Sequence, residues 1–304
     1  MQPAESLPQR ALAAARGSIS TLALTANVLF FCTLMIPVAL VKLAVPYKPL
    51  RRLVDRMLNW IAMSWIGVNN AWIDAAGNSG WAVSGVDGLR RDDWYLVAAN
   101  HQSWVDILVL QKVFSGRVPM LKFFLKRQLI YVPVIGLAWW ALDFPFMQRR
   151  GGMSSARDLE RARLACEKFR LVPTSVINFL EGTRFTRAKH DVQRSPYRHL
   201  LKPRSGGLAT ALATLGSHCH RLLDVTIVYP HGAPKFWQLL SGRVDDVIVR
   251  VEQREIPAEL LDGDYAGDPQ FRARMQEWVN ALWAEKDNLI ERLLPPGLEP
   301  AGAG

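Results

Sequence analysis

The sequence predicts an α/β fold in which helices flank a mixed sheet, and this domain follows an N-terminal helical segment that anchors the chain in a membrane. Two observations predict it. After Trp81, apolar strand-like runs alternate with helical patterns, and before it residues 17–41 carry no charge. The chain has 304 residues, 50% of them hydrophobic and 21% charged, so it is long enough for one large domain and an anchor.

The net charge and the cysteine content limit the kinds of partner and site that we expect. Lysine and arginine number 37 against 27 acidic residues, a net charge of +10. This balance suits an anionic membrane surface or a phosphorylated substrate, whereas nucleic acid ranks last because no basic motif interleaved with aromatic residues is present. The 3 cysteines are far apart and lack metal-ligand spacing, so we expect unpaired thiols in a reducing compartment and no metal site.

The N-terminal region divides into a leader and an anchor. Residues 1–16 are Ala-rich with two arginines and are predicted to be a flexible leader. As a helix, residues 17–41 would extend roughly 37 Å, which exceeds a hydrocarbon core of ~30 Å. The segment is therefore able to span a bilayer, although Pro37 also permits a kink or a shallow re-entrant path.

A second apolar stretch, residues 57–73, completes a membrane anchor predicted over residues 17–76. Its three tryptophans favour the interfacial zone, so we expect a helix that lies along the membrane or pairs with the first one; core packing is the simpler alternative. More basic residues follow the uncharged run than precede it. If that run spans, the main domain faces the cytoplasm from the cell inner membrane.

The main domain, residues 77–294, contains an apolar run that stops abruptly at a histidine. Residues 94–99 are predicted to be a buried strand, residues 100–103 a turn, and Trp104 the start of a helix. His101 therefore falls at a strand-to-helix junction, where an open sheet usually presents catalytic groups.

Asp106 follows His101 by five residues and has two possible roles. From the first helical turn its carboxylate can reach one imidazole nitrogen, which would fix the tautomer and raise basicity. Alternatively, Ser103 and Asp106 form a helix capping box, and backbone groups satisfy His101. The sequence around these residues alone favours neither role.

A second motif favours the catalytic role. Residues 174–186 form another apolar strand, and it ends in Glu181, Gly182, Thr183 and Arg184. Gly182 permits a tight turn with close backbone approach, and Arg184 offers a planar fork suited to a phosphate. The two motifs together indicate a catalytic site much more specifically than either motif alone.

The remaining segments are predicted from their patterns. Residues 118–142 are apolar with three embedded cations, which suggests a surface that meets the bilayer or lines the path of an acyl chain, with ordinary core as the alternative. Residues 186–204 are predicted to be a solvated basic loop. Helices are expected at 155–170, 206–215 and 271–294, strands at 81–86, 222–229 and 244–255, and a loose tail at 295–304.

These motifs resemble those of the glycerolipid acyltransferases that acylate lysophosphatidic acid and related lysophospholipids. The family's Asn-His-x4-Asp motif stands as Asn100, His101 and Asp106, and its Phe-Pro-Glu-Gly-Thr-Arg motif stands at residues 179–184 with Leu180 in place of proline. Its Phe-Ile-x-Arg block matches residues 146–149. The resemblance covers about residues 81–230, and the residues of the two motifs are most similar to those of the lysocardiolipin acyltransferase-like branch.

The resemblance implies an acyltransferase domain that moves a fatty acyl group from acyl-CoA or acyl carrier protein to the hydroxyl of a lysophospholipid, without a metal or cofactor. His101 would be the general base, and Asp106 would orient it. Substrate binding is implied for Lys126, Arg149, Glu181, Gly182, Thr183 and Arg184.

Two rival functions remain open. A lipid hydrolase would use His101 to activate water or Ser103, although Ser103 lacks the Gly-x-Ser-x-Gly elbow. A non-catalytic membrane lipid-binding protein would have no need of His101 or Asp106, so the presence of both argues against it.

Overall fold

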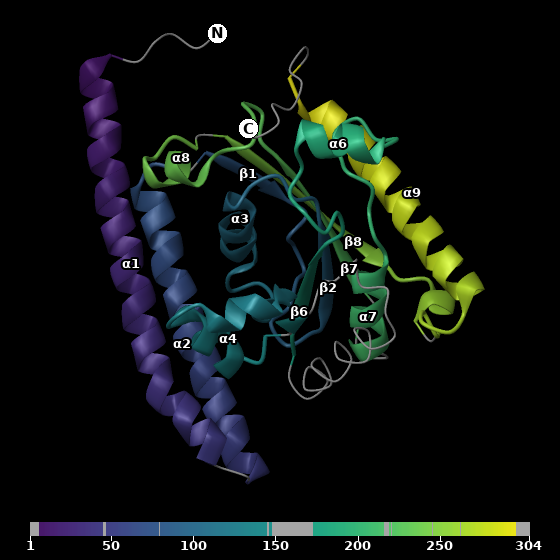
Figure 1. Ribbon diagram of the computed structural model, residues 1–304, viewed down its shortest axis with the longest axis horizontal. Coiled ribbons are helices and arrows are strands. Elements are labelled where there is room, and N and C mark those ends of the chain that lie inside the picture. The colour runs from purple at the N-terminus through teal and green to yellow at the C-terminus, as the bar shows by residue number, and fades with distance from the viewer. Residues whose placement is uncertain are drawn as a thin grey trace.

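A mixed sheet with helices on both faces forms the body of the molecule, and two long N-terminal helices lie along one side of it (Figure 1). The computed structural model describes residues 6–44, 47–78, 80–144, 146–147, 173–215, 219, 221–244, 246–261 and 263–295. The α/β fold with a mixed sheet behind a helical N-terminal segment, predicted from the sequence, is confirmed.

Six strands form the main sheet in the order β1-β8-β7-β2-β6-β3. Their bounds are β1 Trp81–Ser84, β2 Tyr95–Ala99, β3 Leu121–Phe123, β6 Ser175–Phe179, β7 Arg221–Val228 and β8 Val247–Glu255. Only the β7–β8 pair is antiparallel among these described strands. A separate parallel pair joins β4 (Leu125–Lys126) to β5 (Phe146–Met147).

The register of the central strands determines where the site forms. Ala99, the last residue of β2, lies opposite Phe179 at the end of β6 and opposite Val225 in β7. Because β2 and β6 are parallel, the two motifs that follow them begin at the same edge of the sheet.

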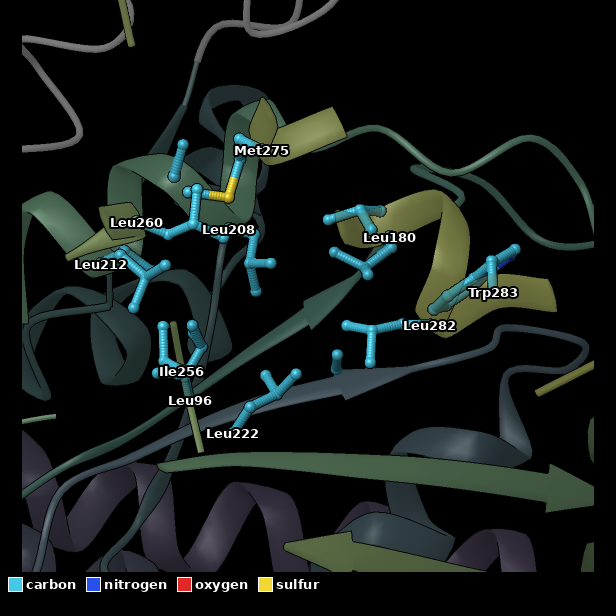
Figure 2. Packing of buried hydrophobic residues seen from close by; sticks show 14 of the residues in the cluster. Leu96, Leu180, Leu208, Leu212, Leu222, Ile256, Leu260, Met275, Leu282 and Trp283 are labelled. Carbon is cyan, nitrogen blue, oxygen red and sulfur yellow. The ribbon is translucent and has the colours of Figure 1, made fainter. Parts of the chain in front are cut away.

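Two hydrophobic cores cover the faces of this sheet. Helices α7 (Gly206–Leu215) and α9 (Pro269–Leu293) pack on one face, where Figure 2 shows Leu96 and Leu222 of the sheet below side chains from both helices. Helix α3 (Val105–Phe114) and the short α8 (Phe236–Leu240) cover the other face. All five residues of β2 are buried, as expected for a central strand covered on both sides.

The N-terminal helices form an antiparallel hairpin. Helix α1 (Leu7–Ala44) packs along α2 (Lys48–Ala75), and α4 (Ile135–Ala141) joins the same core through Ala138 and Ala141. Asn27 Nδ2 donates to Asn69 Oδ1 across the hairpin at 2.8 Å, so these two buried amides pair with each other. The predicted pairing of the two apolar stretches is therefore found.

The start of α1 corrects one prediction. Residues 1–16 were expected to be a flexible leader, yet α1 is helical from Leu7, and Ala13 is buried against its surroundings. Alanine is the best helix former, so a run rich in it extends a helix that packing has already nucleated. Pro37 lies inside α1 without ending it.

The segment predicted as a solvated loop at 186–204 is also corrected. It contains the short helix α6 (Arg187–Gln193), capped by Thr186, and its second half is fixed to α9. Asp287 of α9 accepts the backbone amides of Arg198 and His199, both at 2.8 Å, and Leu201 is fully buried. The predicted helix at 155–170 lies outside the described residues, and 3-10 turns occur at Arg127–Tyr131 (η1) and Ala258–Leu260 (η4).

Candidate active site

His101 and Asp106 form a hydrogen-bonded pair at the carboxyl end of β2. His101 Nδ1 lies 2.8 Å from Asp106 Oδ2, and the two side chains are 13% and 0% exposed. A carboxylate at this distance makes Nδ1 the donor, which leaves Nε2 as the basic nitrogen. None of the described residues hydrogen-bonds to Nε2, so it is free to accept a proton from a substrate.

Asp106 also caps the turn, so its two predicted roles coexist. Its Oδ2 accepts the backbone amides of Gln102 at 2.6 Å and Ser103 at 2.9 Å in addition to the imidazole. The carboxylate lies in the first turn of α3, where the helix dipole stabilises negative charge. Orienting the imidazole and shaping the turn are therefore two effects of one oxygen atom.

Tyr229 completes the surroundings of Asp106. It follows β7, and its hydroxyl donates to Asp106 Oδ1 at 2.6 Å. Burial raises the pKa of Tyr229, and the neighbouring carboxylate raises it further, so the phenol stays a donor at neutral pH. The sequence analysis missed this residue as part of the site; its one signal was its position at the end of a predicted strand.

Asn100 and Phe179 fix the histidine from two directions. Asn100 exchanges two hydrogen bonds with the backbone of Ile227, both at 2.8 Å, and so links the β2 turn to β7. The Phe179 ring stacks on His101 with centroids 4.0 Å apart. This packing restricts rotation of the imidazole, which a precisely placed proton acceptor requires.

Glu181 joins the second motif to the first. It is 1% exposed; its Oε1 accepts the amide of His101 at 3.0 Å, and its Oε2 accepts the amide of Leu201 at 3.3 Å. Desolvation raises the pKa of Glu181 to about 8, against the lowering effect of the two backbone hydrogen bonds. The contacts of Glu181 among the described residues are thus to the protein backbone, and they hold the chain on both sides of the site.

The turn after Glu181 has the backbone that the sequence predicted. Gly182 has φ +67°, a conformation that favours glycine, and it is exposed. Thr183 Oγ1 accepts a hydrogen bond from Lys189 Nζ at 2.9 Å, and the same ammonium donates to the carbonyl of Arg184. Lys189 therefore secures the turn from α6.

Arg184 lies beside the histidine turn. Its guanidinium carbon is 4.9 Å from the centre of the Trp104 ring, and the amide of Phe185, the next residue, donates to the carbonyl of His101 at 2.7 Å. A stacked guanidinium keeps its hydrogen-bonding edge available to a ligand. Trp104 is 57% exposed, so this pair faces outward.

Leu180 explains the departure from the proline of the motif. Its side chain is 1% exposed and packs with Leu282 and Trp283 of α9, as Figure 2 shows. The backbone carbonyl of Leu180 accepts the amide of Arg204 at 2.8 Å. Core packing thus fixes a loop that proline would otherwise stiffen.

Ser103 is unsuited to act as a nucleophile. It is 3% exposed, its hydroxyl donates to the carbonyl of Pro234 at 2.5 Å, and it accepts the amide of Val105 at 3.1 Å. An activated serine needs its hydroxyl hydrogen-bonded to a base, and here that proton is directed to a backbone carbonyl.

Two predicted substrate-binding residues are not placed by this geometry. Lys126 lies in β4, paired with Met147 of β5, and this backbone position is all that is described of it. Arg149 lies outside the described residues. The structure therefore brings His101 and Asp106 together with residues 181–184. The roles of Lys126 and Arg149 stay predictions.

Comparison with known proteins identifies the motif region. Residues 81–230 match the family model described as Acyltransferase. Over 218 residues the chain is 27% identical to 1-acyl-sn-glycerol-3-phosphate acyltransferase gamma of Mus musculus, covering 67% of this chain and 54% of that protein. It is 26% identical to 1-acyl-sn-glycerol-3-phosphate acyltransferase 3 of Arabidopsis thaliana, covering 65% and 53%. The chain thus spans about half the length of these curated relatives.

A solved structure shares the fold. The crystal structure of the 1-acyl-sn-glycerophosphate (LPA) acyltransferase PlsC from Thermotoga maritima aligns with a TM-score of 0.55 at 17% identity, covering 93% of this chain and 98% of that one. The alignment therefore includes both the N-terminal helices and the sheet.

Titration of Glu181 predicts a pH dependence of stability. Its pKa rises from 4.5 to about 8 on folding, so between these values the unfolded chain releases a proton that the folded chain retains. Stability contributed by this group is therefore present below about pH 4.5 and lost as pH rises towards 8, by up to about 1.4 kcal/mol per pH unit.

The Glu181→Gln variant isolates this effect, since other titrations cancel in the difference. We expect the unfolding free energy of the wild type minus that of the variant to decrease from pH 5 to pH 8 and to level off above it, as measured by urea denaturation. A difference that stays constant with pH would contradict the raised pKa.

Proposed function

We propose that this chain, which belongs to the acyltransferase family through residues 81–230, transfers a fatty acyl group from an acyl thioester to the hydroxyl of a lysophospholipid. The observation that carries this proposal is the His101 Nε2 atom, left basic by the Asp106 contact at Nδ1 and unpaired among the described residues. The curated relatives are named for acylation of 1-acyl-sn-glycerol-3-phosphate, so lysophosphatidic acid or a close analogue is the proposed acceptor.

The chemical step follows from this geometry. Nε2 of His101 removes the proton from the acceptor hydroxyl as its oxygen attacks the thioester carbonyl. Asp106 stabilises the imidazolium that forms, and Tyr229 and the two turn amides keep this carboxylate in place. The tetrahedral intermediate then expels the thiolate, which takes the proton back from His101. The acyl group ends as an ester, and the donor leaves as a free thiol.

Positive and polar groups of the second motif would bind the charges. Arg184, stacked on Trp104, is proposed to hold the acceptor phosphate, with Lys126 and Arg149 as further phosphate ligands. The backbone amides of Thr183 and Arg184 donate to none of the described residues, and we assign them to the oxyanion. Glu181 is proposed to act through its backbone contacts, as a positioning residue. The donor is acyl-CoA or acyl carrier protein.

Membrane association is proposed from the N-terminal hairpin. Among the described helices, α1 is long and apolar enough to cross a bilayer by length and composition. Many of its large apolar side chains are exposed, including Leu22 at 71% and Phe30 at 64%. A surface of this kind is stable in contact with lipid and costly in water.

The contacts of α1 favour a helix that lies in one leaflet over one that spans. Gly17 lies against Trp237 of α8, and the Lys42 ammonium donates to the carbonyl of Ala141 at 2.8 Å. These residues are 25 positions apart, roughly 37 Å along a helix, yet both ends contact the same folded domain. A spanning helix would carry one end away from that domain. We place the enzyme on the cytoplasmic leaflet of the cell inner membrane, whose anionic lipids attract its +10 charge.

Replacing His101 by alanine tests the general base. Turnover of labelled acyl thioester with a lysophospholipid should fall by about 10²–10⁴-fold, because the proton acceptor is lost. His231→Ala is the matched control, since His231 also pairs with an aspartate, Asp246, but is exposed. Appreciable turnover in folded His101→Ala protein would rule out this assignment, and release of free fatty acid in place of the ester would indicate a hydrolase.

Replacing Arg184 by lysine tests the phosphate assignment. Lysine keeps the charge but loses the planar fork and the stack on Trp104, so the acceptor KM should rise roughly tenfold with a much smaller change in the donor KM. Arg187→Lys is the control, because Arg187 is exposed on α6. A selective rise in the donor KM would instead assign Arg184 to the donor.

Cysteine labelling tests the position of α1. In protein whose native cysteines are replaced by serine, we expect Arg10→Cys, Leu43→Cys and the domain marker Glu277→Cys to react with an impermeant maleimide from the same side of sealed vesicles. Labelling of Arg10→Cys from the opposite side would show that α1 crosses the bilayer.

A further inference from the structure

A cavity of about 590 Å³ lies at the end of the sheet opposite His101. Its lining includes Met120, just before β3, and Thr174, just before β6, whereas His101 and Glu181 follow the other ends of β2 and β6. A five-residue strand is roughly 17 Å long, so this cavity is separate from the candidate active site. Its volume is typical of a site for a small molecule.

The carboxylates that line this cavity are neutralised within the protein. Lys42, 6% exposed, places its ammonium 2.8 Å from Asp55 Oδ1 and 2.5 Å from Asp143 Oδ2. The third carboxylate, Asp92, forms an ion pair with Arg90 at 2.9 Å. No acidic group of the lining is therefore left to neutralise the other cations there.

Three arginines of the lining lack acidic partners. Arg51 and Arg52 are exposed at the start of α2, and Arg91 lies in the turn before β2, with its Nε directed to the carbonyl of Gly116. Within the described part of the chain, no carboxylate lies within ion-pair distance of any of the three. Arginines that line a cavity whose carboxylates are already paired with other cations are suited to bind a phosphate.

Apolar side chains also line the cavity, and further ones are exposed on the hairpin next to it. Leu58 and Met63 of α2 line it together with Met120 and Leu142. Outside it, the hairpin exposes further apolar side chains near its turn, namely Leu40, Leu43, Leu50 and Leu53. A ligand with an anionic head and an apolar tail would match both parts of this surface, whereas a free anion would match only the arginines.

We propose that this cavity binds the phosphate headgroup of a membrane phospholipid, with Arg51, Arg52 and Arg91 on the phosphate and the adjoining acyl carbons against Leu58 and Met63. The proposal rests on the membrane association proposed above, but not on the chemistry at His101. A lipid held there fixes the hairpin turn to the headgroup layer and so sets the height of the active site in the leaflet.

Photolabelling with a phosphatidic acid that carries a photoreactive acyl chain tests the site on the full chain in detergent. Adducts are expected on peptides that contain residues 51–63 and 119–122. The Arg51→Gln/Arg52→Gln variant should label at least about tenfold less at these peptides, since two charge-assisted contacts are lost. Met63→Trp, which fills the cavity without changing charge, should have a similar effect.

The control is Arg56→Gln/Arg272→Gln, which loses the same charge from exposed positions outside the cavity lining. Equal loss of labelling in both double variants would show a nonspecific charge effect and overturn the proposal. Labelling confined to peptides around His101 would also overturn it. Short-chain phosphatidic acid should compete and inorganic phosphate at the same concentration should not; equal competition would identify a free-anion site.

Turnover separates this proposal from the proposed function. With a soluble short-chain acceptor, Arg51→Gln/Arg52→Gln should stay within about twofold of the wild type, because the cavity is a strand length away from His101. Absence of turnover in the wild type would contradict the proposed function, while the labelling result would still test the lipid site. A large fall of turnover in this variant alone would place the arginines in substrate binding and overturn a separate site.

Discussion

The buried carboxylate of Asp106 is the group on which the candidate site depends. It has no solvent exposure, and it accepts four hydrogen bonds, from the His101 imidazole, the amides of Gln102 and Ser103, and the hydroxyl of Tyr229. A buried charge is tolerated when it is hydrogen-bonded, and here both carboxylate oxygens accept hydrogen bonds. The same carboxylate therefore fixes the turn between β2 and α3 and determines which imidazole nitrogen is basic.

Parallel pairing of β2 with β6 supplies the second half of the site. The register places Ala99 opposite Phe179, so the turns that follow the two strands are neighbours, and Glu181 can bond to the backbone of His101. Burial of Glu181 is costly, as its raised pKa shows, and it is compensated in part by the amides on both of its oxygens. Leu201, whose amide donates to Glu181, is held in turn by α9. The indole of Trp283 in that helix donates to the Leu201 carbonyl at 3.2 Å.

Much of this could be predicted from local sequence, and the rest depended on long-range contacts. The strand that ends before Asn100, the pair of His101 and Asp106 and the turn at Gly182 all follow from patterns within a few residues. Tyr229 could not be assigned to the site without the position of β7 beside β2. The segment at 186–204 is rich in polar residues, and its burial follows from contacts with α9, which lies about 90 positions further along the chain. Composition alone cannot show such anchoring.

The same limit applies to the N-terminal helices, where the sequence allowed a spanning helix. That possibility rested on the length of the uncharged run at residues 17–41, which does not show what the helix contacts. Lys42, just after this run, is buried between Asp55 and Asp143 and so joins α1 to α2 and to the segment after α4. Trp237 contacts α1 near its other end. α1 is held against the domain that carries His101 near both ends, and its exposed apolar side chains are the surface proposed to meet one leaflet. The proposed lipid acceptor would then reach Nε2 of His101 with its acyl chain still in hydrocarbon, and the cost of extracting that chain into water, about 0.8 kcal/mol per methylene, would be avoided.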